Sequence, residues 1–136
     1  MGAGALGTVI AAYLGRAGHD VALIARGERA RHLEEHGVTV TGLDKFTADL
    51  EIVKQPQHLS STDVLILATK TYDTAAAIAA VQHMNVGTVF SIQNGVMKNA
   101  QLTDAFGMEA VLGAVAMLGG VVQPDGAANY MMDNPI

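Results

Sequence analysis

The chain has 136 residues, a net charge of -5 with histidine neutral, 50% apolar residues and 15% charged residues. This length suits one compact domain, and the composition suits a well-packed globular protein. No run of Lys and Arg marks a nucleic-acid or lipid surface, and no segment has the ~18 consecutive apolar residues of a membrane helix. The chain has no Cys, which excludes disulfides and thiolate metal sites. We therefore expect no nucleic-acid or membrane partner and a cytoplasmic location, with which a cysteine-free chain is compatible.

The first half of the chain is expected to alternate helices and strands. Apolar residues at helical spacing, from Leu6 to Leu14, predict a helix over residues 5–17. Further periodic and apolar segments predict a buried strand at 20–25, a polar helix at 28–36, and two short strands or a hairpin at 38–42 and 50–53.

The second half continues this alternation. Its apolar runs predict strands at 63–69, 88–92 and 110–115, helices at 73–83 and 98–105, and a turn-rich end with a strand at 128–132. Alternating buried strands and helices are typical of an α/β fold with a doubly wound, mostly parallel sheet. In such a sheet, ligands bind at the carboxyl ends of the strands.

The stretch MGAGALG places Gly2, Gly4 and Gly7 at the G-x-G-x-x-G spacing of a dinucleotide-binding turn. The glycines of such a turn allow a tight bend, close approach of a pyrophosphate and close helix packing, while the helix N-terminus attracts the phosphates. The alternative is a glycine-rich helix start that binds nothing. The following helix and the strand at 20–25 favour the binding turn. This turn also needs a preceding strand, and only Met1 precedes it here.

Arg26 follows the second strand of the expected binding unit. NAD sites place Asp or Glu there to bind the ribose 2′-hydroxyl, whereas an Arg suits the 2′-phosphate of NADP. Glu28 nearby is a weak signal in the other direction, and a merely solvated Arg26 is the alternative. The sequence therefore favours NADP.

Lys70 and Asn94 each follow a predicted buried strand, within ATKTYDTAAAI and SIQNGV. Both are expected at the carboxyl edge, where an ammonium can reach a phosphate or a carboxylate and an amide can orient a ribose or a substrate hydroxyl. The alternatives are an exposed Lys and an ordinary Asn-Gly turn. No metal site is expected, because the five His lack ligand spacing.

The ordered motifs GAGALG, LIARG, ATKTYDTAAAI, SIQNGV and AVLGAV resemble the N-terminal domain of ketopantoate reductases (2-dehydropantoate 2-reductases). The resemblance runs from Gly2 to about Gly126 and implies a Rossmann-like, NADP-binding domain over residues 1–136. The implied activity is NADPH-dependent reduction of 2-dehydropantoate to (R)-pantoate, on the route to pantothenate and coenzyme A. The small-molecule partner would be a 2-keto acid.

The resemblance also implies the site residues. Arg26 would meet the 2′-phosphate, Lys70 would contact the cofactor, and Asn94 would lie between nicotinamide and substrate. Gly119 or Gly120 lies near another cofactor contact of the family. The pyrophosphate would be bound by Gly2, Ala3, Gly4, Ala5, Leu6 and Gly7.

The family also has a helical domain that supplies its catalytic Lys and Glu and several substrate-binding Asn. No catalytic residue is therefore expected in this chain. We expect the first strand and the helical domain to be missing, the domain to be partial, and the isolated chain to be poorly stable and inactive.

Two other functions remain open at this stage. One is a related NADP-dependent reductase of a different 2-keto acid, since the substrate pocket lies mostly in the helical domain. The other is a non-catalytic dinucleotide-sensing Rossmann module. An oligomer is compatible with the sequence, which does not determine it.

Overall fold

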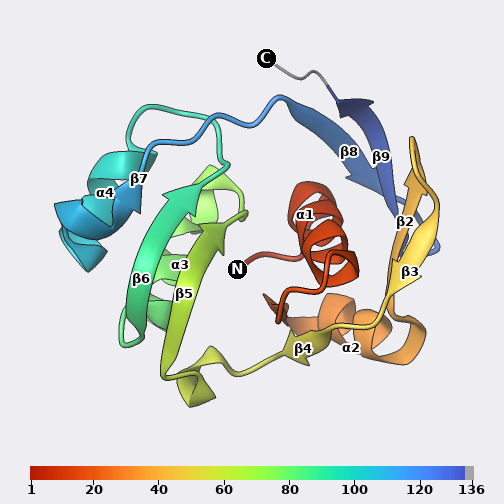
Figure 1. Ribbon diagram of the computed structural model, residues 1–136, viewed down its shortest axis with the longest axis horizontal. Coiled ribbons are helices and arrows are strands. Elements are labelled where there is room, and N and C mark those ends of the chain that lie inside the picture. Colours follow the sequence, from red (N-terminus) through yellow and green to blue (C-terminus); the bar gives the residue numbers. More distant parts are fainter. Residues whose placement is uncertain (134–136) are drawn as a thin grey trace. The chain divides into compact units, whose positions relative to one another are not determined.

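The computed structural model describes residues 1–133 and divides into two compact units. The first unit consists of Met1 and Gln55–Ala116, and the second of Gly2–Lys54 and Met117–Ile136. Each unit has its own sheets and helices (Figure 1). None of the helices within residues 1–133 is long and apolar enough to cross a membrane.

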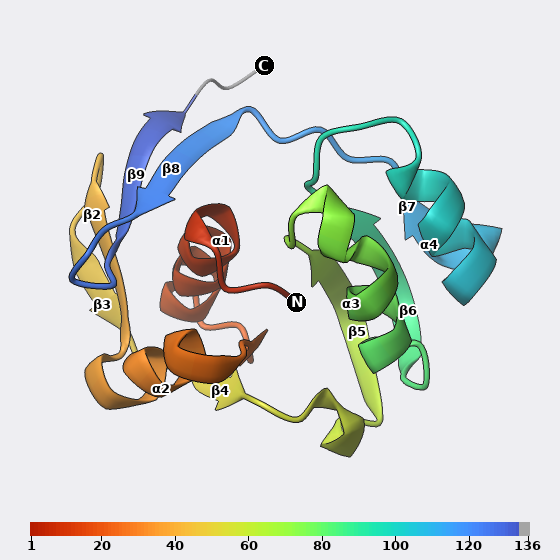
Figure 2. The same cartoon turned by 180° about the vertical axis from the view of Figure 1, so that it is seen from behind.

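The first unit is built on a parallel sheet with strand order β5-β6-β7. Helix α3 covers one face of this sheet, behind β5 and β6 in Figure 1 and in front of them in Figure 2. Leu67, Val81, Val89 and Leu102 are fully buried in this unit. Its elements are η1 (Pro56–His58), β5 (Ser61–Leu67), η2 (Thr71–Asp73), α3 (Thr74–Val81), β6 (Asn85–Ser91), α4 (Lys98–Phe106), η3 (Met108–Ala110) and β7 (Val111–Leu112).

The second unit contains a parallel pair, β1-β4, and a mixed sheet of order β3-β2-β9-β8. Helix α1 packs against the strands of the mixed sheet, and α2 packs against β4. The elements are α1 (Ala5–Arg16), β1 (Ala22–Ile24), α2 (Gly27–His36), β2 (Val38–Gly42), β3 (Phe46–Ala48), β4 (Glu51–Val53), β8 (Leu118–Val122) and β9 (Ala128–Asp133).

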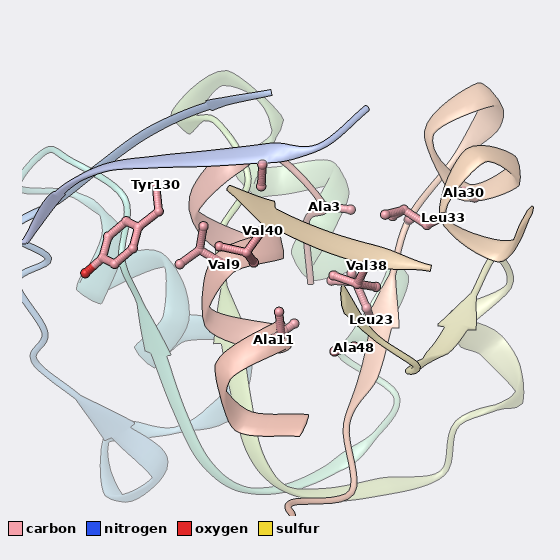
Figure 3. Close-up of a cluster of buried hydrophobic side chains, with 13 residues drawn as sticks. Ala3, Val9, Ala11, Leu23, Ala30, Leu33, Val38, Val40, Ala48 and Tyr130 are labelled. Atoms are coloured by element: carbon pink, nitrogen blue, oxygen red, sulfur yellow. The ribbon is translucent and has the colours of Figure 1, made fainter. Parts of the chain in front are cut away.

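The second unit's core joins side chains from α1, α2 and the strands (Figure 3). Val9 of α1, Leu33 of α2, and Val38 and Val40 of β2 are each at most 2% exposed. Burial of an aliphatic side chain of this size stabilises a fold by about 1.5–3 kcal/mol. The apolar face predicted for residues 5–17 is therefore the face that holds α1 in place.

The structure confirms the α/β class and the predicted helices and parallel strands to within a few residues. It confirms short strands at 38–42 and 50–53, but these two strands do not form a hairpin with each other. Strand β2 forms its antiparallel hairpin with β3, which was not predicted, and β4 pairs in parallel with β1. The strand predicted at 110–115 is only Val111–Leu112, and β8 lies in a stretch expected to be turns.

Met1 forms hydrogen bonds with strand β5. Its ammonium donates to the carbonyl oxygen of Ile66 at 2.7 Å, and the Ala68 N–H donates to the Met1 carbonyl at 2.8 Å. This alternation is the pattern of a parallel strand pair. Within residues 1–133 no strand precedes the glycine turn, and this one residue is bound to the edge of β5.

Candidate functional site

The glycine turn has the geometry of an anion-binding helix start. Gly2 has φ 103°, which favours glycine, and its N–H donates to the Ile24 carbonyl at the end of β1. Gly4 is the exposed N-cap of α1 and provides no side-chain cap. The first N–H groups of the helix, from Ala5 to Gly7, have no partner within the helix, and its first turn has no acidic side chain. Together these features leave backbone donors and a positive dipole end free for phosphate oxygens.

Arg26 lies at the N-cap of α2, two residues beyond the end of β1. Its side chain is exposed, and it forms no ion pair within residues 1–133. Glu28, whose carboxylate was a weak indication of NAD, instead pairs with Arg31: its Oε1 lies 3.6 Å from the Arg31 Nη2. The β1 end and the glycine turn belong to one unit, and the Gly2–Ile24 hydrogen bond joins them at 3.2 Å.

Lys70 and Asn94 lie together at the carboxyl edge of the sheet in the first unit. Leu67 of β5 pairs with Ser91 of β6, and each of the two polar residues follows its strand by three positions. Both side chains are exposed. Gly95, with φ 107°, forms the bend after Asn94, so this segment is a turn, and it lies at the carboxyl edge of the sheet.

Gln93 connects the Lys70 loop and the Asn94 loop through hydrogen bonds, a role that was not predicted from the sequence. Its Nε2 group donates to the carbonyl oxygens of Thr69 and Lys70 at 2.8 and 3.2 Å, and to the hydroxyls of Thr69 and Thr74 at 3.1 and 2.9 Å. Its Oε1 accepts from the Ser91 hydroxyl at 2.9 Å. Gln93 is 7% exposed, so its amide is a buried link between the Lys70 loop and the Asn94 loop.

Lys98 is a second residue that the sequence did not single out. Its Nζ donates to the carbonyl oxygens of Ser91, Gln93 and Ala114 at 3.0, 2.7 and 2.7 Å. An ammonium has three N–H donors, so backbone carbonyl oxygens use all the donors of Lys98. These bonds connect the end of β6 to the segment after β7. An open surface pocket lies beside it, lined by residues 93–96, 98–99 and 113–116. Asn94 is at this pocket.

Gly120 of β8 lies near the start of α1. A Cβ atom at Gly120 would lie 3.6 Å from the Ala5 Cβ and 2.8 Å from the Asn129 carbonyl oxygen. The β8 backbone therefore comes close to the glycine turn inside the second unit. The expected cofactor contact near Gly119 or Gly120 stays a prediction.

The predicted residues fall into two groups. Gly2 to Gly7 and Arg26 belong to the second unit, and Lys70 and Asn94 belong to the first. Within residues 1–133 no group of three or more His, Asp or Glu side chains is arranged to hold a metal ion. The group in the second unit offers backbone amides and a guanidinium, which suit phosphate oxygens. The group in the first unit offers an ammonium and an amide, which suit a polar ligand.

The chain is similar in sequence to archaeal reductases. It is 30% identical over 131 residues to the 2-dehydropantoate 2-reductase of Pyrococcus abyssi, and 32% identical over 130 residues to that of Archaeoglobus fulgidus. Both alignments cover 96% of this chain, but 43% and 42% of the relatives. The chain thus spans less than half the length of the curated relatives that it matches.

Solved structures share the fold. The 2-dehydropantoate 2-reductase of Geobacter metallireducens matches 98% of this chain and 45% of its own, with TM-score 0.89 and 24% identity. A D-mandelate dehydrogenase, solved with NADH and anilino(oxo)acetate, matches 96% of this chain and 44% of its own, with TM-score 0.86 and 23% identity.

A family model described as "Ketopantoate reductase PanE/ApbA" matches residues 1–136. This match confirms the resemblance that the ordered motifs carried, over the whole of the sequence. The chain belongs to the ketopantoate reductase family.

Proposed function

We propose that this chain is the cofactor-binding domain, residues 1–136, of a cytoplasmic reductase that uses NADPH to convert 2-dehydropantoate to (R)-pantoate. The reaction belongs to pantothenate and coenzyme A biosynthesis. The observation that carries the choice of cofactor is the end of β1, where Arg26 is exposed, free of any ion pair within the described chain, and not accompanied by an acidic residue at the ribose position. Family membership supports the choice of reaction.

Each predicted residue then has a part in binding. The turn from Gly2 to Gly7 binds the pyrophosphate through backbone N–H groups and the helix dipole. Arg26 binds the 2′-phosphate, for which a guanidinium offers two parallel donors. Lys70 contacts the cofactor from the end of β5. When bound, the reduced nicotinamide supplies the hydride that reduces the 2-keto carbon.

Asn94 is the residue of this chain nearest to the chemistry in this proposal. Its amide has donors and an acceptor, so it can bond a nicotinamide ribose and a substrate oxygen together. It is presented at an open pocket, and Gln93 and Lys98 hold the surrounding loop. The proposal assigns neither proton donation nor most of the substrate binding to a residue of this chain.

A related 2-keto acid reductase is a second candidate, favoured by one observation. The D-mandelate dehydrogenase shares the fold at TM-score 0.86, so this framework serves a reductase with another substrate. The dinucleotide-sensing alternative differs from both, because it predicts binding without turnover.

The test is a steady-state comparison of 2-keto acids with the protein expressed from its complete gene, following NADPH oxidation. We expect kcat/KM to be highest for 2-dehydropantoate. Asn94→Ala should lower kcat by about tenfold or more, because one hydrogen bond to the reacting groups is lost. Asn85→Ala, at the opposite end of β6, is the matched control and should leave kcat unchanged. A preference for another 2-keto acid would favour the second candidate, and NADPH binding without turnover would favour the sensor.

A further inference from the structure

Arg29 on α2 reaches back to the glycine turn. Its Nε donates to the Ala3 carbonyl oxygen at 2.9 Å, and its two terminal nitrogens donate to the Thr8 hydroxyl at 3.1 Å and the Gly126 carbonyl oxygen at 2.6 Å. These acceptors lie on three segments of the second unit: the turn, helix α1 and the loop between β8 and β9. One guanidinium thus links all three.

Of these three acceptors, the Ala3 carbonyl oxygen is the one whose position determines the orientation of the turn. It accepts a second hydrogen bond from the Thr8 hydroxyl at 3.2 Å, and both Ala3 and Thr8 are buried. A peptide unit is planar and trans, so its C=O and the next N–H point in opposite directions. Fixing the Ala3 carbonyl toward Arg29 therefore aims the Gly4 N–H the other way. No hydrogen bond within residues 1–133 uses that N–H, and Gly4 is exposed.

The positive charge of Arg29 has no carboxylate partner within residues 1–133. All three of its acceptors are neutral, and no ion pair of Arg29 occurs within the described residues. Burial lowers the pKa of its guanidinium from the ordinary value, and no carboxylate pairs with it within residues 1–133 to offset this effect. A partly buried cation beside a helix N-terminus that lacks acidic side chains raises the local positive potential.

We propose that Arg29 is a positioning residue for the cofactor's pyrophosphate. It acts through the Ala3–Gly4 peptide, whose orientation presents the Gly4 N–H to a phosphate oxygen. Arg26, in contrast, touches the 2′-phosphate directly. This assignment rests on the proposed dinucleotide function, but the orientation of the turn is a property of the free protein.

Two substitutions separate positioning from charge. Arg29→Met removes every donor, while Arg29→Lys keeps the charge but offers a single nitrogen that cannot serve three separated acceptors. Arg31→Met is the matched control, because Arg31 is exposed on the same helix and its ion pair with Glu28 is long at 3.6 Å. Fluorescence titration with NADPH and with NADH gives the two affinities. Circular dichroism checks that each variant is folded.

We expect both Arg29 variants to lose about tenfold in affinity, and equally for the two cofactors, because the pyrophosphate is common to them. Arg31→Met should bind as the unsubstituted chain does. In the free protein, Arg29→Met should shift the carbonyl ¹³C signal of Ala3 and the amide ¹⁵N signal of Gly4. If Arg29→Met does not fold, Thr8→Val removes the other donor to Ala3 and should shift the same signals with a smaller loss of affinity.

Three results would overturn the proposal: wild-type affinity in Arg29→Lys, a loss confined to NADPH, or unchanged Ala3 and Gly4 signals. The first would mean that charge alone suffices, and the second that Arg29 binds the 2′-phosphate. If the unsubstituted chain binds neither cofactor, the proposed function fails. The Ala3 and Gly4 signals need no ligand, so they still decide whether Arg29 orients the turn.

Discussion

The side-chain amide of Gln93 donates a hydrogen bond to the carbonyl oxygen of Lys70 at 3.2 Å. This bond joins the loops that follow two neighbouring parallel strands, β5 and β6. The same amide nitrogen also meets the Thr69 carbonyl and the Thr74 hydroxyl. The spacing between the Lys70 and Asn94 loops is therefore set by a buried side chain.

Gln93→Glu should destabilise the chain, because a carboxylate would face oxygen atoms that now accept hydrogen bonds. We expect the free energy of unfolding to fall by ~2–3 kcal/mol, the cost of leaving buried polar groups unpaired. The loss should be larger at pH 7 than at pH 5, where a protonated carboxyl keeps one donor. Urea denaturation at both pH values measures this. Gln101→Glu, exposed on α4, is the control, and an equal loss in both variants would contradict the role of Gln93.

Lys98→Met should also lower the free energy of unfolding, because it removes the hydrogen bonds that the Lys98 ammonium donates. Three backbone carbonyls lose their charged donor, so we expect a loss of ~2–3 kcal/mol in unfolding free energy. Lys45→Met, at an exposed site, should change stability by about 0.5 kcal/mol or less. Thermal or urea unfolding of the two variants side by side makes the comparison. A Lys98 variant as stable as the Lys45 variant would show that its three short hydrogen bonds contribute nothing net.

Arg26→Gln should change cofactor preference without changing the fold. Losing a charge-assisted contact with the 2′-phosphate is expected to weaken NADPH binding by about tenfold to a hundredfold. NADH lacks that phosphate, so its affinity should not change. Titration with both cofactors gives the ratio. Equal weakening for NADH and NADPH would place Arg26 away from the 2′-phosphate.

For the 136-residue polypeptide prepared with Met1 as its free N-terminus, the buried amino group predicts a pH dependence of the free energy of unfolding. Burial lowers its pKa from the ordinary value of 8.0 to about 6. Between these values the unfolded chain binds more protons than the folded one, so stability should rise from pH 6 to pH 8, by ~2–3 kcal/mol in all. Urea denaturation across this range tests it, with intact mass confirming that Met1 is retained. N-terminal acetylation should flatten the rise, and an unchanged slope after acetylation would assign it to other groups.

The sequence was sufficient for the elements whose own residues carry a pattern. The apolar period of residues 5–17 and the continuous apolar runs of β5 and β6 identified α1 and the parallel sheet. The pairing of β4 with β1 was not predictable, because three-residue strands have almost no period and their partner is chosen by packing elsewhere. Strand β8 was not predicted, because Gly119 and Gly120 are typical of turns. The strand needs glycine at position 120, since a Cβ atom there would lie 2.8 Å from the Asn129 carbonyl oxygen.

In the candidate site, too, some residues could be placed from the sequence and others could not. Lys70 and Asn94 were predictable because parallel strands bring their carboxyl ends to one edge, and the register of Leu67 with Ser91 places them there. Gln93, Lys98 and Arg29 were not, because they bond to backbone carbonyls of segments distant in the sequence. No spacing rule signals such contacts. The polar Gln93 directly after a buried strand was the one local hint.

In the proposed function, this chain binds NADPH through the glycine turn and Arg26. The most direct measurement is a titration of the purified chain with NADPH and with NADH, following nicotinamide fluorescence, with circular dichroism on the same sample. The sequence led us to expect a poorly stable chain, but each unit has its own buried side chains. We therefore predict a folded α/β chain that binds both cofactors and prefers NADPH by about tenfold or more. A folded chain that binds neither cofactor, or that prefers NADH, would contradict the claim.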